Sequence, residues 1–330
     1  MRRIGRGPNQ RGAVLAWTAI LLTVLIGCAA LAIDLGLGWM SRRNLVTTTD
    51  AAALAAAAEY SAGGDGCASV ASSYVGLNAP GATMTACDVS ANGTTGYVTV
   101  DALENINTNF AQVLGVTDFD TTSSSTAQWG PPSAATGLRP YGLCSESAEM
   151  QAFLANPQAT QTHTIAYTKT DLTACGNSEG NWGEIALNRG SPSQSQIKDW
   201  VENGYNGEVL AGTLGGICAV EAYACYPPSP GTITGASKEM KDLQDSGIYF
   251  GLPIFDSVEG NGANAQFHLV GFVKVRVVDF KFNGAEQNRY MTLEFSPGLI
   301  TGSCCNPGGP QTNAVVIAIC AVDRNNLGAC

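Results

Sequence analysis

The chain has 330 residues, of which 45 % are hydrophobic and only 13 % are charged, and its net charge is −10. Residues 1–34 hold four Arg and one Asp, whereas residues 35–330 hold 13 basic and 26 acidic side chains. Phosphate binding needs clustered Lys and Arg, so this acidic body excludes nucleic acid as an expected partner.

The first predicted element is a transmembrane helix. Residues 13–33 form an apolar run of 21 residues without a charge. As a helix this run is about 31 Å long, which matches a hydrocarbon core of about 30 Å. Four Arg precede it and only Arg42 and Arg43 follow it closely, so the positive-inside rule places the N-terminus in the cytoplasm. Trp17 and Trp39 are expected near the two headgroup layers.

Two other interpretations of this segment stay open. Ala30-Leu31-Ala32 has the form of a signal-peptide cleavage site, but the apolar run exceeds the usual 7–15 residues. Leu25-Ile26-Gly27-Cys28 has the form of a lipobox, yet the apolar character continues past Cys28 to Ile33. We therefore predict a retained helix with Cys28 inside the bilayer. Asp34 either pairs with a neighbouring helix or marks the end of the span in the interface.

The helix is expected to continue beyond the membrane. Leu35, Trp39, Val46 and Ala53 fall near one helical stripe, and the Ala-rich run Asp50–Tyr60 is strongly helix-forming. Gly63 and Gly64 end it. The predicted organisation is a cytoplasmic basic tail (1–12), a transmembrane helix (13–33), a stalk helix (34–60), a small α+β pilin-like unit (61–129), a linker (130–140) and a disulfide-rich α+β domain (141–330).

Periodicity and turn residues predict the elements of the two exterior units. The small unit is expected to contain helices at 68–77 and 105–114, and strands at 83–89, 96–100 and 117–129. The larger domain is expected to contain helices at 145–154, 193–203 and 234–245, and strands at 165–168, 248–255, 265–282, 290–295 and 315–322. The Gly-rich run 259–264 is expected to be a hairpin loop. The fold class is therefore α+β, with a long N-terminal transmembrane and stalk helix before a strand-rich exterior.

Eleven cysteines support this topology. One, Cys28, lies in the span, and the exported ten are Cys67, Cys87, Cys144, Cys175, Cys218, Cys225, Cys304, Cys305, Cys320 and Cys330. An even exported set predicts five disulfides in an oxidising compartment. Zinc is the weaker alternative, because the chain has no C-x-x-C and only two His.

Connectivity is not determined by sequence, but spacing suggests local bridges. These join Cys67 to Cys87, Cys144 to Cys175 and Cys218 to Cys225. A direct bond between the adjacent Cys304 and Cys305 would be strained, so each is expected to pair with Cys320 or Cys330.

No catalytic or cofactor-binding motif occurs in the sequence. His268 lies on an apolar strand pattern, where a lone His is usually structural. We predict a non-enzymatic protein without cofactor, metal or small-molecule substrate. An exported hydrolase that uses His163 or His268 in a triad remains an alternative.

The N-terminal residues carry a family resemblance. Gln10-Arg11-Gly12-Ala13 leads into the span, and Asp34, the Arg42-Arg43 pair and Asp50-Ala51-Ala52-Ala53-Leu54 follow. This pattern resembles the N-terminal segment of TadE/TadG-like proteins of the Tad (Flp-type) pilus assembly system. Residues 253–256 and 268–272 are similar, more faintly, to C-terminal segments of actinobacterial members.

The resemblance implies a single-pass protein of the cytoplasmic membrane with an extracytoplasmic bulk and a role in pilus assembly. Its expected partners are the membrane and other pilin-like or platform proteins. The expected anchor residues are Arg11, Gly12, Trp17, Asp34 and Trp39, and the expected family motif is Asp50, Ala51, Ala52, Ala53 and Leu54.

Two features of this sequence differ from the family pattern and limit what the resemblance implies. Processed members have Glu five residues after the cleaved Gly, where this chain has Trp17, which argues against processing. Longer members carry a von Willebrand type A domain with an Asp-x-Ser-x-Ser site, and residues 120–124 have the wrong spacing for it. We therefore expect a TadG-like protein without that domain. The alternative from another class is an independent membrane-tethered binding module or lipoprotein.

Overall fold

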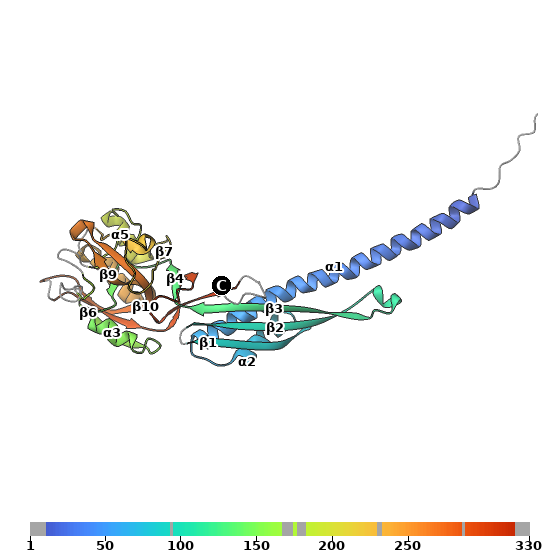
Figure 1. Cartoon of the computed structure of the whole chain (residues 1–330), viewed down its shortest axis with the longest axis horizontal. Coiled ribbons are helices and arrows are strands. Elements are labelled where there is room, and N and C mark those ends of the chain that lie inside the picture. Colours follow the sequence, from blue (N-terminus) through green and yellow to red (C-terminus); the bar gives the residue numbers. More distant parts are fainter. Residues whose placement is uncertain are drawn as a thin grey trace, which may run out of the picture.

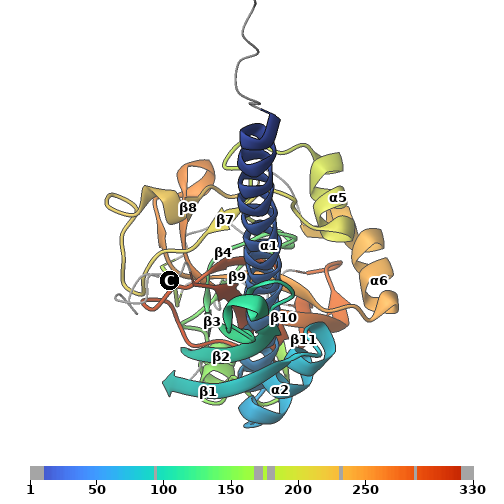
Figure 2. The ribbon, with the colours of Figure 1, turned by 90° about the vertical axis from the view of Figure 1, so that its right-hand side faces the viewer.

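The computed structural model describes residues 11–92, 95–166, 174–176, 183–229, 233–285 and 288–320. These residues form a long stalk and a rounded body (Figure 1). The body lies at the end of the stalk opposite the start of α1. Seen from that start, it sits behind α1 and extends to both sides of it (Figure 2).

The stalk consists of two helices and a five-stranded sheet. Its elements are α1 (Arg11–Ser61), α2 (Cys67–Asn78), β1 (Ala82–Asn92), β2 (Thr95–Asn107), the short 3₁₀ turn η1 (Ala111–Leu114), β3 (Asp118–Gly130), β12 (Gly298–Leu299) and β14 (Ala314–Ile319). The strand order is β1-β2-β3-β14-β12. All pairs are antiparallel except β12 with β14.

The body contains two further sheets, in the orders β5-β9-β10-β11-β6 and β13-β4-β7, with β8 also paired to β10. Its strands are β4 (Pro132–Ala135), β5 (Leu143–Cys144), β6 (Gln161–Ala166), β7 (Val209–Leu210), β8 (Cys225–Tyr226), β9 (Phe250–Glu259), β10 (Gln266–Lys281), β11 (Tyr290–Phe295) and β13 (Gly302–Cys304). Its helical segments are α3 (Ala148–Leu154), α5 (Gln194–Asn203), η2 (Ala222–Ala224), η3 (Ile233–Ala236), α6 (Ser237–Ser246) and η4 (Gly262–Asn264).

The predicted fold class is confirmed: one long apolar helix precedes a strand-rich α+β domain with several disulfides. The helix expected over 13–60 is the continuous α1, and the hairpin loop expected at 259–264 joins β9 to β10. In β10, Val273, Val275 and Val277 are buried while Lys274 and Arg276 are partly exposed. This alternation buries one face of the strand in the body core.

The amphipathic helix expected at 105–114 is wrong. Strand β2 continues to Asn107, and Ile106 pairs with Phe119 of β3. Only Ala111–Leu114 is helical, as a 3₁₀ turn ended by Gly115, whose φ of 89° favours glycine. Pairing of β2 with β3 continues as far as Asn107↔Asp118 and overrides the local helical period of the first residues of this segment.

The segment expected as a linker, residues 130–140, is not a free connection. It contains β4, which pairs with both β13 and β7 and is largely buried. The apolar strand expected at 315–322 is β14, which leaves the body and pairs with β3 of the stalk. The chain therefore returns to the stalk sheet after building the body, and the unit boundaries given above stay a prediction.

The cysteine pairs that spacing suggested are bonded pairs in the structure: Cys67–Cys87, Cys144–Cys175 and Cys218–Cys225. Cys28 is free and exposed on α1. Cys320 is disulfide-bonded, and Cys330 lies outside the described residues.

The expectation for Cys304 and Cys305 is contradicted, because these two are bonded to each other across a cis peptide. Their position explains why Cys320 is not their partner. Cys305 lies against Gly130 at the end of β3, whereas the Cys320 N–H donates to the Thr126 carbonyl. Four strand residues span about 13 Å, which exceeds the Cα separation that a disulfide can bridge.

Candidate functional site

The N-terminal half of α1 is an unpacked apolar surface. Of the described residues, α1 is the one helix long and apolar enough to cross a membrane, and no residue of its most apolar stretch is buried. Trp17 and Trp39 are both exposed, and the Arg43 guanidinium lies 5.8 Å from the Trp39 ring centre. Arg11 and Gly12 belong to the first turn, but their side chains lie outside the described part of the chain.

Asp34 ends this surface and is covered by the turn that joins β2 to β3, residues 108–117, here called the hairpin tip. The Asp34 carboxylate accepts backbone N–H groups from Asn109 at 2.9 Å, Phe110 at 3.1 Å and Ala111 at 2.6 Å. Only 5 % of Asp34 remains exposed. Its partner is therefore a backbone turn of its own chain.

Replacing Asp34 with Ala is expected to release the hairpin tip. The loss of charge-assisted hydrogen bonds should cost roughly 2 kcal/mol locally, or about 30-fold faster exchange of the Asn109–Ala111 amides. Hydrogen exchange of the full chain in lipid nanodiscs measures this. Asp88→Ala, at an exposed carboxylate of β1 away from the tip, should leave these amides unchanged. Unchanged exchange in Asp34→Ala would contradict the assignment.

Beyond Asp34, α1 packs on the sheet through small and hydroxyl side chains. Phe119 lies over Gly38, where an added Cβ would come within 2.6 Å of the ring. The Thr49 hydroxyl is 2.9 Å from that of Ser123 and 2.8 Å from that of Ser125. These contacts give Ser123 and Ser125 of β3 their hydrogen-bond partner on α1. Of the stripe expected along α1, Leu35, Trp39 and Val46 are exposed, and only Ala53 lies on the buried face.

The expected family motif lies at the centre of this packing. Asp50 accepts a hydrogen bond of 2.6 Å from the Ser125 hydroxyl, and Ala52 and Ala53 are fully buried. Ala51 is partly buried and Leu54 is partly exposed. Small side chains at these positions let α1 approach both the sheet and α2 closely, so the motif forms a packing surface of the stalk.

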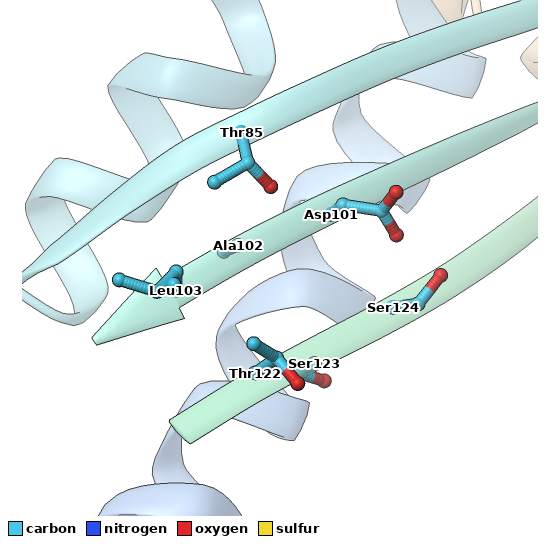
Figure 3. Close-up of a pocket in the computed structure, with 7 residues that line it drawn as sticks. All are labelled: Thr85, Asp101, Ala102, Leu103, Thr122, Ser123 and Ser124. Carbon is cyan, nitrogen blue, oxygen red and sulfur yellow. The ribbon is translucent and has the colours of Figure 1, made fainter. Parts of the chain in front are cut away.

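The outer face of the stalk sheet carries a shallow depression, lined by Thr85, Asp101, Ala102, Leu103, Thr122, Ser123 and Ser124 (Figure 3). Asp101 is its only charged lining residue. Thr122, Ser123 and Ser124 lie in strand β3, with Ser123 turned toward α1. No group of three or more His, Cys, Asp or Glu that could hold a metal occurs among the described residues. The depression therefore offers one carboxylate and several hydroxyls.

A buried charged cluster lies in the body. His268 of β10 is fully buried, its Nδ1 is 2.8 Å from Asp256 Oδ1, and its Nε2 is 2.9 Å from Glu221 Oε2. The Thr213 N–H donates to Glu221 at 2.9 Å, and the Gly215 N–H donates to Asp256 at 2.7 Å. The cluster therefore fastens residues 212–221 onto β9 and β10. Sequence analysis missed it, because its members are 12 and 47 residues from His268.

This arrangement is not a catalytic triad. A triad needs one imidazole nitrogen free to receive a proton from a hydroxyl, but carboxylates occupy both nitrogens of His268. His163 packs edge-on against Phe153 and Phe295 and lies 3.1 Å from Gln161 Oε1. The geometry at both His is that of structural residues.

The cluster makes the stability of this region depend on pH. Burial alone would lower the pKa of His268, but its bonds to Asp256 and Glu221 outweigh burial and raise that pKa. Burial would raise the pKa of Asp256, yet the bonds from His268 and Gly215 lower it overall. The Thr213 N–H is the main cause of the lowered pKa of Glu221.

The directions of these pKa shifts define the pH range in which the cluster stabilises the fold. A raised His pKa stabilises the fold below about pH 6.5, and this contribution disappears as pH rises through the folded-state pKa. Lowered carboxylate pKa values contribute above about pH 4.5, and their contribution disappears as pH falls through the folded-state values. The cluster is therefore most stabilising between these limits.

We expect the Thr213 and Gly215 amides to lose protection above this window, after correction for intrinsic exchange. His268→Gln should remove this pH dependence and cost about 2 kcal/mol locally, since it loses one of two charge-assisted hydrogen bonds. Hydrogen exchange between pH 5 and 9 measures both effects. His163→Gln should leave these two amides unaffected. Equal protection across the range in the unmodified chain would refute the prediction.

Together, α1 and the sheet packed on its second half define a class of architecture: a long helix, apolar and unburied in its first half, that carries a strand-rich α+β unit on its second half. Residues 12–59 match the model of the Flp pilus-assembly TadE/G-like family. The match associates the chain with Tad/Flp pilus assembly and covers the apolar half of α1 together with its packed half. No curated protein matches the chain. No solved structure matches it either.

Proposed function

We propose that this chain is a non-enzymatic, membrane-anchored component of a Tad/Flp-type pilus assembly system, acting as a minor pilin-like subunit or an assembly anchor. Its N-terminus lies in the cytoplasm, α1 crosses the inner membrane, and the stalk and body lie outside. It is a TadG-like protein without a von Willebrand type A domain. Its partners are other pilin-like helices or proteins of the assembly platform.

One observation carries the proposal: a single helix of 51 residues is apolar and unpacked in its first half and packed on a sheet in its second half. The unpacked half offers a surface to lipid and to neighbouring helices. The family-matched residues 12–59 span both halves, and the packed half attaches the rest of the chain to the anchor. The disulfides fit a head that works in an oxidising exterior.

A gene deletion in the source organism tests the proposal. Loss or strong reduction of surface pili is expected, with recovery on complementation by the full chain. A matched chain that carries a cleavable signal peptide in place of residues 1–33 should be exported yet fail to restore pili, because it lacks the anchor. Normal piliation in the deletion strain would refute the proposal.

An independent tethered binding module is the second candidate, and one surface favours it. Leu214, Ile217, Val220 and Tyr223 are exposed in the loop that the His268 cluster and the Cys218–Cys225 bond hold in place. Exposed apolar side chains on a braced loop are typical of binding surfaces. In the same deletion strain, normal pili with lost adherence would favour this candidate.

A further inference from the structure

The hairpin tip is the one part of the described exterior that α1 holds beside its apolar half. The helix from Val14 to Ile33 is about 30 Å long, the thickness of a hydrocarbon core. Asp34 is the next residue, and its carboxylate binds the tip through three N–H groups. The tip is thereby placed at the level where the hydrocarbon core ends and the headgroup layer begins. Figure 1 shows the hairpin of β2 and β3 running along α1, away from the body.

The chemistry of the tip suits that level. Residues 105–117 contain no Asp, Glu, Lys or Arg. Val113 is 84 % exposed, Val116 is 49 % exposed and Phe110 is 44 % exposed. A turn at a fully aqueous surface has no need for three such side chains, whereas an interfacial layer accepts aromatic and aliphatic groups.

The adjoining surface of α1 has the same character. Leu35, Trp39 and Met40 are exposed, and the first exposed charges after Asp34 are Arg42 and Arg43. The helix and the tip therefore present one continuous uncharged layer just outside the span. The Asp34 charge, which would interrupt this layer, is buried beneath the tip.

We propose that the hairpin tip is a second membrane contact, which rests in the outer headgroup layer beside α1 and inserts Phe110, Val113 and Val116. The occupant of this surface is the outer leaflet of the membrane that α1 crosses. A single helix in a membrane is free to rotate about its own axis. A second contact beside it fixes that rotation and, with it, the orientation of the stalk on the membrane. This inference rests on the membrane crossing of α1 in the proposed function.

The test uses the full chain with Cys28→Ala, so that a single added cysteine carries an environment-sensitive fluorophore. The labelled positions are Val113→Cys in the tip, Leu22→Cys in the span and Leu77→Cys on α2. Leu77 is 76 % exposed and so matches Val113. Each protein is placed, one copy per disc, in phosphatidylcholine nanodiscs with or without a nitroxide-labelled lipid.

We expect blue-shifted emission and several-fold quenching by the nitroxide lipid at positions 22 and 113, and neither effect at 77. Val116→Cys repeats the tip measurement if Val113→Cys does not fold. Quenching at 22 without quenching at 113 overturns the tip contact and leaves the anchor intact. A blue shift at 113 without lipid quenching indicates protein cover and also overturns it. Absence of quenching at 22 rejects the anchor and the inference together.

Discussion

Replacing Cys144 and Cys175 with Ala is expected to destabilise the body by about 4 kcal/mol, since a bridge closing roughly 30 residues contributes that much in the chain-entropy model. Both residues are buried, 31 positions apart in sequence. The bond joins β5, which pairs with β9 at Phe255, to the turn whose Cys175 carbonyl accepts the Val258 N–H. Its loss should loosen the edge of the largest sheet.

Hydrogen exchange of β9 and β10 in the full chain measures this effect. The expected loss corresponds to roughly a thousand-fold drop in protection of the slowest amides. Removing Cys218–Cys225 is the matched control, because this bond closes only seven residues and should cost about 2.5 kcal/mol. Equal effects of the two changes would contradict the role of loop length.

Replacing Glu184 with Gln is expected to stabilise the body by about 3 kcal/mol at pH 8.5. Burial raises the pKa of Glu184 to about 7, and within the described residues its Oε1 has no hydrogen-bond partner. An acid whose folded-state pKa is raised stabilises the fold below about pH 4.5, and that contribution is lost as pH rises through 7. Above pH 7 an ionised carboxylate must remain buried, which Gln avoids.

Urea unfolding of the full chain in detergent at pH 4.5 and pH 8.5 checks this prediction. The two proteins should differ little at pH 4.5 and most at pH 8.5. Glu202→Gln, at an exposed carboxylate, provides the matched control and should change neither value by more than about 0.5 kcal/mol. A Glu184→Gln protein that is less stable at pH 8.5 would show that the carboxylate is needed there.

Patterns that are local in sequence could be predicted for this chain. Each of these patterns lies within a single helix or strand. They are the uncharged run 13–33, the Ala-rich continuation to Tyr60 and the alternating valines of β10. The three short disulfides were also predictable, because nearby cysteines meet within one supersecondary unit.

Contacts between distant residues could not be predicted. Asp34 meets the tip 75 residues later, and His268 meets Glu221 across 47 residues. The segment 105–114 was expected as a helix because its local period is helical, yet strand pairing with β3 prevails. The vicinal Cys304–Cys305 bond depends on where the end of β3 places Cys305 relative to Cys320.

For this protein, the sequence by itself determined the anchor: a helix long and apolar enough for a bilayer, with a family-like segment at 12–59. The length of the apolar run, the charges on its two sides and the small residues that follow it are properties of one continuous segment. They can be read without knowing which distant residues contact that segment. The tertiary structure alone decided what meets the anchor. Asp34 was expected either to pair with a neighbouring helix or to mark the end of the span, and in the structure it is the point at which the hairpin tip is fastened to α1. A buried carboxylate needs hydrogen-bond donors, and only the folded chain brings three backbone N–H groups to Asp34.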